Sequence, residues 1–118
     1  MGEYRNAGLD AVLGAVADST RRAIIARLAV SDARVTEVAA GFPMSLNSVS
    51  KHIRMLERAG LVEREVVGRD HYLSLNAKPL AEAAEWIDAY RRFWSGKLAA
   101  LEDFIKQKHQ TTGKRKRR

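Results

Sequence analysis

Apolar and polar residues between positions 45 and 61 alternate with the period of a two-faced α-helix. At about 100° per residue, one face collects the apolar residues Leu46, Val49, Ile53 and Leu56. The opposite face collects Asn47, Lys51, Arg54 and Arg58, flanked by Ser48 and Ser50. Ser45 is placed to accept a hydrogen bond from the first turn, and Gly60 can adopt the left-handed conformation that ends a helix. The pattern predicts a helix over 45–58 with one face in the core and the other exposed.

Three shorter amphipathic patterns precede this helix. The first has apolar residues at helical spacing: Leu9, Val12, Leu13 and Val16. The second follows Asp18, which is placed to cap it, and its inward positions are Ile24, Ile25 and Leu28. Its outward Arg21 and Arg22 either contact phosphate or are solvated. A turn is expected at 31–33, and a brief third helix carries Val35, Val38 and Ala39 and ends at Gly41.

The connector at 41–44 has the length of about four residues that a helix-turn-helix uses, although an ordinary helical hairpin has the same spacing. Residues 62–75 then alternate as two β-strands around a turn at 68–70. A hairpin directly after the helix is the wing of a winged helix-turn-helix. Its Arg64 and its tip residue Arg69 are candidate contacts to the DNA backbone or minor groove, where negative potential favours arginine. Tip arginines are also common in plain turns.

A long helix is predicted over 78–109, on the order of 45 Å in length at 1.5 Å per residue. Its apolar face consists of Leu80, Ala83, Ala84, Ile87, Tyr90, Trp94, Leu98, Leu101 and Ile105, widened by Trp86, Phe93 and Phe104. A surface helix needs an apolar stripe only about 100° wide. A helix with a single-sided core face would leave these aromatic side chains in water. We therefore expect half of this face to pack against a second copy of the chain.

Composition and charge limit the possible domain organisation, partners and localisation of the chain. The 118 residues form one domain, with a flexible N-terminus at 1–8, a folded part at 9–109 and a basic, disordered tail at 110–118. The net charge is +7, but without the five basic residues 114–118 the chain has 16 cations against 14 acids. Any nucleic-acid contact must therefore depend on where the charges lie. No apolar run is long enough to span a bilayer and no signal peptide is present, so a cytoplasmic protein without membrane association is expected.

Candidate chemistry beyond DNA binding is weak. There is no cysteine, which excludes disulfides and thiolate metal sites. His52 either packs against the hairpin or reaches phosphate. Ser50 and His52 are two residues apart and point to different sides of a helix, so they do not pair as nucleophile and base. We expect no enzyme activity, no cofactor and no metal, although a zinc site of His109 with Glu102 or Asp103 across a dimer is conceivable.

With these elements in place, the sequence resembles the ArsR family of bacterial winged-helix repressors over about residues 9–108. The stretches that carry the resemblance are residues 17–22 (ADSTRR), 44–53 (MSLNSVSKHI), 56–62 (LERAGLV), 68–69 (GR), 84–87 (AEWI) and 90–94 (YRRFW). The resemblance implies a homodimer built from the first and last helices, bound to a palindromic operator near its own promoter. It also implies that Asn47, Ser50 and Lys51 face the major groove.

The sequence also departs from part of this family. Metal-sensing members have a Cys-x-Cys in the third helix, where this chain has Thr36-Glu37-Val38-Ala39. Others have His and acidic ligands in the last helix, where this chain has Tyr90, Phe93 and Trp94. The chain is more similar to the cysteine-free branch, which responds to a signal other than a thiolate-bound metal or to none. A small-molecule effector of unknown identity remains open.

The sequence thus predicts a mostly α fold with a β-hairpin wing, in the order α-α-α-α-β-β-α, dimerising through its first and last helices. The predicted function is a sequence-specific transcriptional repressor that binds double-stranded DNA. The alternative is a winged-helix protein-interaction module that does not read DNA. The expected DNA contacts are Ser45, Asn47, Ser48, Ser50, Lys51, His52, Arg54, Arg64 and Arg69. The expected dimer contacts are Leu9, Val12, Leu13, Val16, Ile87, Tyr90, Trp94, Leu98, Leu101 and Ile105.

Overall fold

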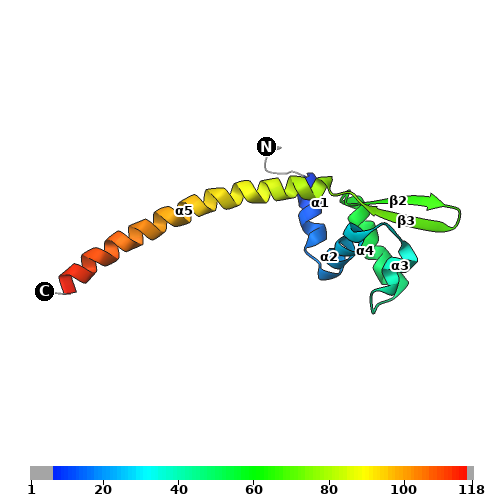
Figure 1. Ribbon diagram of the computed structural model, residues 1–118, viewed down its shortest axis with the longest axis horizontal. Helices are drawn as coiled ribbons and strands as arrows, with labels where there is room; N and C mark the ends of the chain where they lie inside the picture. The colour runs from blue at the N-terminus through cyan, green and yellow to red at the C-terminus, as the bar shows by residue number, and fades with distance from the viewer. Residues whose placement is uncertain (1–6, 117–118) are drawn as a thin grey trace. The chain divides into compact units, whose positions relative to one another are not determined.

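The computed structural model describes residues 7–116, which form five helices and three short strands (Figure 1). In chain order the elements are α1 (Ala7–Val16), α2 (Ser19–Val30), β1 (Ala33–Arg34), α3 (Val35–Ala40), α4 (Leu46–Arg58), β2 (Val62–Val67), β3 (Asp70–Leu75) and α5 (Lys78–Lys116). The chain divides into two compact units, residues 1–83 and 84–118. The predicted fold class, mostly α with a β-hairpin wing, is confirmed.

Helix ends in the first unit are set by the residues that the sequence suggested. The carboxylate of Asp18 caps α2 by accepting a hydrogen bond from the backbone N–H of Arg21 at 3.0 Å. The hydroxyl of Ser45 caps α4 by accepting from the N–H of Ser48 at 3.1 Å. After α4, Gly60 has φ +75°, a conformation that only glycine adopts without steric cost. These caps fix where α4 begins and ends.

The core of the first unit gathers apolar side chains from every helix and strand around α4. Its buried members are Val12, Ala15, Ile24, Leu28, Ala33, Val38, Val49, Ile53, Leu56, Leu61, Val62, Leu73 and Ala83. Leu46 was predicted to join them, and that prediction is wrong, because its side chain is 51% exposed. Leu46 is the first residue of α4, and the buried contacts of this helix start one turn later, at Val49.

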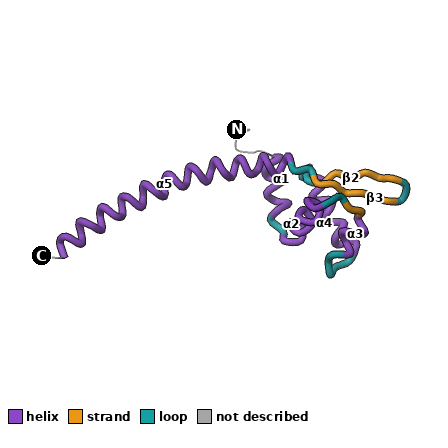
Figure 2. Tube along the Cα trace, viewed as in Figure 1, coloured by secondary structure: helices purple, strands orange, loops and turns teal. Residues whose placement is uncertain are grey.

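The wing is part of a three-stranded antiparallel sheet in the order β1-β3-β2 (Figure 2). Strands β2 and β3 pair from Val62 with Leu75 to Val67 with Asp70, as the predicted hairpin requires. Strand β1 was not predicted, since the segment was expected to be a turn. It pairs Ala33 with Leu73, and both side chains are buried. Two residues are too few to show a strand period, so only this tertiary pairing reveals the strand.

Helix α5 contributes to both units. Its first turns belong to the first unit, where Ala83 is buried and Leu80 packs against the core. Beyond Ala83, the large apolar side chains are exposed in the single chain, from 44% for Trp94 to 60% for Phe104. Among the described residues, no helix combines the length and apolarity needed to cross a membrane.

The predicted boundaries need adjustment at both ends. Helix α1 begins at Ala7 rather than at residue 9, and the rest of the predicted flexible N-terminus, 1–6, lies outside the described residues. Helix α5 runs to Lys116, so most of the segment 110–118 that was predicted to be disordered is helical. Lysine and arginine are good helix formers, so a basic composition did not by itself mark a helix end. Residues 117–118 lie outside the described residues.

Candidate nucleic-acid interface

Helix α4 separates its residues between the core and the surface, as its periodicity predicts. Val49, Ile53 and Leu56 are each 0% exposed. The exposed polar side chains of the helix are Asn47, Ser48, Lys51, Arg54 and Arg58, while Ser50 is half-buried. Amide and hydroxyl groups thus lie toward the start of the helix, and cations follow along its length. Such a face can present hydrogen-bonding groups to base edges and positive charge to phosphates.

Two of the predicted hydroxyl contacts are joined to each other. Ser45 Oγ donates to Ser48 Oγ at 2.9 Å and accepts from the Ser48 backbone N–H at 3.1 Å. Both residues are exposed. Ser45 is therefore committed to capping α4, whereas the Ser48 hydroxyl can still donate its own proton to a ligand.

The two predicted wing arginines have different surroundings. Arg64 binds Glu57 of α4 through two nitrogen atoms, at 2.8 and 3.2 Å, and its Nη1 lies 3.1 Å from Nδ1 of His71. This bidentate pair fastens the last turn of α4 to strand β2. Arg69 is exposed in the turn between β2 and β3. Of the two, Arg64 holds the wing to α4, and Arg69 is the one whose side chain is exposed at the tip.

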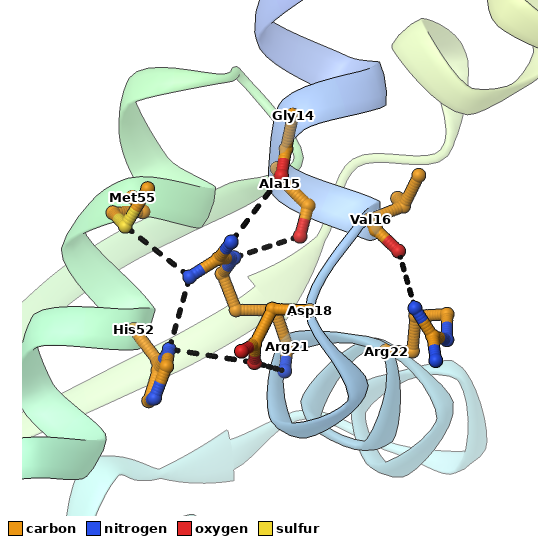
Figure 3. A network of polar contacts seen from close by, with 8 residues as sticks. All are labelled: Gly14, Ala15, Val16, Asp18, Arg21, Arg22, His52 and Met55. Atoms are coloured by element: carbon orange, nitrogen blue, oxygen red, sulfur yellow. Dashed lines mark hydrogen bonds and ion pairs between the residues drawn. The ribbon is translucent and has the colours of Figure 1, made fainter.

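Arg21 forms a polar cluster that the sequence did not reveal (Figure 3). Its Nε and Nη2 donate to the carbonyls of Ala15 and Gly14, at 2.7 and 3.2 Å. Its Nη1 lies 3.1 Å from Nδ1 of His52 and 3.3 Å from Sδ of Met55, both on α4. Arg21 was expected either to contact phosphate or to be solvated, and the contacts seen here correspond to neither alternative. Its guanidinium satisfies carbonyls at the end of α1 and ties that helix to α4.

Arg22 has a similar role, since its Nη1 donates to the carbonyl of Val16 at 2.8 Å. The sequence showed only two adjacent outward arginines after a helix cap. The signal in the sequence was the position of the two arginines shortly after the end of α1. From there, a guanidinium can reach the carbonyls in the last turn of that helix.

His52 belongs to this cluster, and its polar contacts are to Arg21 and Asp18 rather than to the hairpin. Its Nδ1 lies 3.7 Å from Oδ2 of Asp18. The hydrogen bond from the Arg21 backbone lowers the pKa of the Asp18 carboxyl, and the nearby His52 and Arg21 charges act in the same direction. Because Nδ1 of His52 faces Arg21 and Asp18, a phosphate contact by this ring would have to use Nε2.

The predicted dimer contacts fall into two groups. Val12 is 2% exposed and part of the core of its own chain, so it has almost no surface to offer a partner and that prediction is wrong. Its neighbours Leu9, Leu13 and Val16 are half-buried. The α5 members are all exposed: Ile87, Tyr90, Trp94, Leu98, Leu101 and Ile105.

Aromatic side chains gather on the exposed surface of α5 between Trp86 and Trp94. The rings of Trp86 and Tyr90 stack with centroids 5.3 Å apart, and those of Tyr90 and Trp94 are tilted at 5.9 Å. Phe93 meets Trp94 edge to face at 6.0 Å. Within the described part of the chain, no three His, Asp or Glu side chains lie close enough together to hold a metal ion.

Comparison with known proteins agrees with this geometry. A family model for a helix-turn-helix domain matches residues 16–65, from the end of α1 to the middle of β2. The chain is 35% identical over 105 residues to the HTH-type transcriptional regulator Rv2034 of Mycobacterium tuberculosis, covering 89% of this chain and 94% of the relative. It is 32% identical over 76 residues to the transcriptional repressor SdpR of Bacillus subtilis, covering 64% of this chain and 84% of the relative. Both relatives are regulators of transcription.

A solved structure extends the similarity to the fold. The ArsR-like transcriptional regulator from Rhodococcus sp. RHA1 superposes with a TM-score of 0.72 at 30% sequence identity. The match covers 88% of this chain and 96% of that protein.

Proposed function

Since this chain belongs to the ArsR family of winged helix-turn-helix transcriptional regulators, we propose that it acts as a homodimeric repressor on a palindromic operator. Helix α4 enters the major groove, and the β2–β3 wing lies on the adjacent backbone or minor groove. The exposure of Asn47 and Lys51, opposite the fully buried Val49, Ile53 and Leu56, is the observation that carries this proposal.

The chemistry of that face suits base readout. An asparagine can bind the N6 and N7 atoms of adenine with two hydrogen bonds, and a lysine can bind O6 and N7 of guanine. Arg54 and Arg58 follow one and two turns later on the exposed side of α4 and supply charge for phosphates. Arg69 supplies the corresponding charge from the wing.

The homodimer is supported by the exposed apolar surface of α5. Tyr90, Trp94, Leu98 and Leu101 each leave between 44% and 59% of their area exposed in the single chain. Contiguous apolar surface of this kind marks an interaction site in a soluble protein. To enter successive major grooves on one face of DNA, the two recognition helices of such a dimer have to lie about 34 Å apart.

The test is selection of DNA from a random pool by the full chain, followed by the mass of the complex. The proposal predicts enrichment of an inverted repeat with half-site centres about 10 base pairs apart, and two chains on each duplex. A variant lacking residues 111–118 controls for the basic tail and should enrich the same repeat. If no repeat is enriched and the remaining DNA binding vanishes with the tail, only non-specific attraction is left. One chain per duplex would refute the dimer.

A further inference from the structure

Leu46 is the apolar residue of α4 that does not enter the core. The three other apolar residues of its predicted stripe are fully buried, whereas half of the Leu46 side chain is exposed. Single exposed leucines are ordinary on protein surfaces. This one, however, occupies the first position of the helix proposed to enter the major groove and lies directly before Asn47.

The surroundings of Leu46 are a groove between the start of α4, α3 and the wing. Besides Leu46, the groove is lined by Val35 and Thr36 of α3, Ser50 of α4, and Arg34, Arg64, Arg69, Asp70 and His71. The lining carries three arginines against one carboxylate, that of Asp70, and its apolar side chains are Leu46 and Val35. The excess of positive charge suits a DNA strand, which presents base edges in the groove and phosphates outside it.

Leu46 also has no evident role in holding α4 in place. The first turn of the helix is capped by Ser45, whose hydroxyl binds the backbone of Ser48. The packing of the helix rests on Val49, Ile53 and Leu56. The exposed part of Leu46, at the start of the helix, is therefore available for a contact outside the chain.

We infer that Leu46 contacts the 5-methyl group of a thymine, at or next to the base pair that Asn47 reads, and so helps to determine sequence specificity. Thymine is the base that presents a methyl group in the major groove, and apolar side chains recognise it there. The inference rests on the proposed function. It adds that each half-site contains a thymine whose recognition depends on its methyl group rather than on hydrogen bonds.

The test uses deoxyuridine, which differs from thymidine only by lacking this methyl group. In the selected operator, each thymine position is replaced by deoxyuridine in both half-sites, one position at a time, and the affinity of the full chain is measured. At one position the affinity should fall by roughly fourfold per half-site, the effect of removing one methyl group from an apolar contact. Leu46→Ala should bind the normal operator about as weakly, and deoxyuridine at that position should cause no further loss.

Val30→Ala is the matched control, because Val30 is also an exposed apolar residue of the first unit but lies at the end of α2. It should bind the normal operator like the wild type and keep the full sensitivity to deoxyuridine.

The outcomes separate this inference from the proposed function. If the wild type binds the selected operator but no deoxyuridine weakens it, or if Leu46→Ala stays as sensitive as the wild type, the inference is overturned and the proposed function stands. If no operator can be selected at all, the proposed function fails and the inference fails with it. The deoxyuridine series on the wild type needs no variant, so a folding defect in Leu46→Ala cannot hide the answer.

Discussion

Helices α4 and α5 carry apolar stripes with the same kind of spacing, yet the chain buries one stripe and leaves the other exposed. In α4, Val49, Ile53 and Leu56 have no accessible surface. In the second unit, Trp94, Leu98 and Leu101 of α5 have about half of theirs accessible. Apart from Leu46 at its start, the apolar stripe of α4 is covered within one chain, and its polar face is available for a ligand. The packing of α5 is incomplete, and we propose that a second copy completes it.

The largest expected effect comes from placing a charge on the incomplete helix. Trp94→Glu puts an unpaired carboxylate into each half of the proposed interface, and an uncompensated buried charge typically costs about 3–5 kcal/mol. The variant should be monomeric by analytical ultracentrifugation. Its affinity for the selected operator should fall by at least roughly a hundredfold, because two half-sites are then bound independently.

Arg92→Glu is the control, since Arg92 lies on the opposite side of the same helix at about 100° per residue. It places the same carboxylate on the other face, with a charge change of −2 rather than −1, and should remain dimeric. A dimeric Trp94→Glu protein would show that the exposed stripe of α5 is not the interface.

The next prediction compares how much the apolar faces of α4 and α5 contribute to the free energy of unfolding of a single chain. In the monomeric Trp94→Glu background, Ile53→Ala should lower the free energy of unfolding by about 2–5 kcal/mol, because it opens a cavity in the core. Leu98→Ala should change it by no more than about 0.5 kcal/mol, because Leu98 is exposed in the single chain. Urea denaturation measures both values. Equal losses would mean that α5 covers its apolar face within its own chain.

A smaller effect is expected from the wing. Arg69→Ala should weaken binding to operator and unrelated DNA alike, since an arginine that binds phosphate reads no sequence. The slope of log affinity against log salt should become shallower by about 0.9 for each phosphate that the variant no longer neutralises, measured by titration at several salt concentrations. Weakening confined to the operator would instead assign Arg69 to base readout.

The smallest effect concerns the cluster that joins α1 to α4. The pKa of Asp18 is lowered in the folded state, so its contribution to stability is present above the ordinary value of 3.8 and is lost as the pH falls through the folded pKa. Thermal unfolding should show the wild type losing stability between about pH 5 and pH 3. Asp18→Asn keeps a capping side chain but removes the charge, and should lose less over this range.

The exposed carboxyl of Glu65 on the wing provides a comparison for this measurement. Glu65→Gln should retain the acid sensitivity of the wild type. If Asp18→Asn were as acid-sensitive as the wild type, the charge of the Asp18 carboxylate would not contribute to stability.

Elements that follow from local sequence patterns were predictable from the sequence. The caps at Ser45 and Asp18, the end of α4 at Gly60 and the hairpin over 62–75 all follow from local rules, and the structure agrees with them. These rules depend on residues close together in the chain. For that reason, the recognition helix and the wing could be placed from the sequence.

Features that depend on distant contacts could not be predicted in this way. Strand β1 exists because Ala33 pairs with Leu73, and Arg21 is held by α4, thirty-one positions further along the chain at His52. Periodicity assigned Leu46 to the core, and the family resemblance made Val12 of the first helix a dimer contact; the burial of the two side chains contradicts both. A stripe shows which residues share a face, but it cannot show where along that face the packing stops or which chain covers it.

The most direct test of the account is the affinity of the Asn47→Ala, Lys51→Ala double variant for the operator selected by the wild type. Each exposed side chain should contribute about 1–3 kcal/mol to operator binding, so the variant should bind at least roughly thirtyfold more weakly while remaining folded and dimeric. Its affinity for unrelated DNA should change far less. Operator binding equal to that of the wild type would contradict the claim that the exposed face of α4 reads DNA.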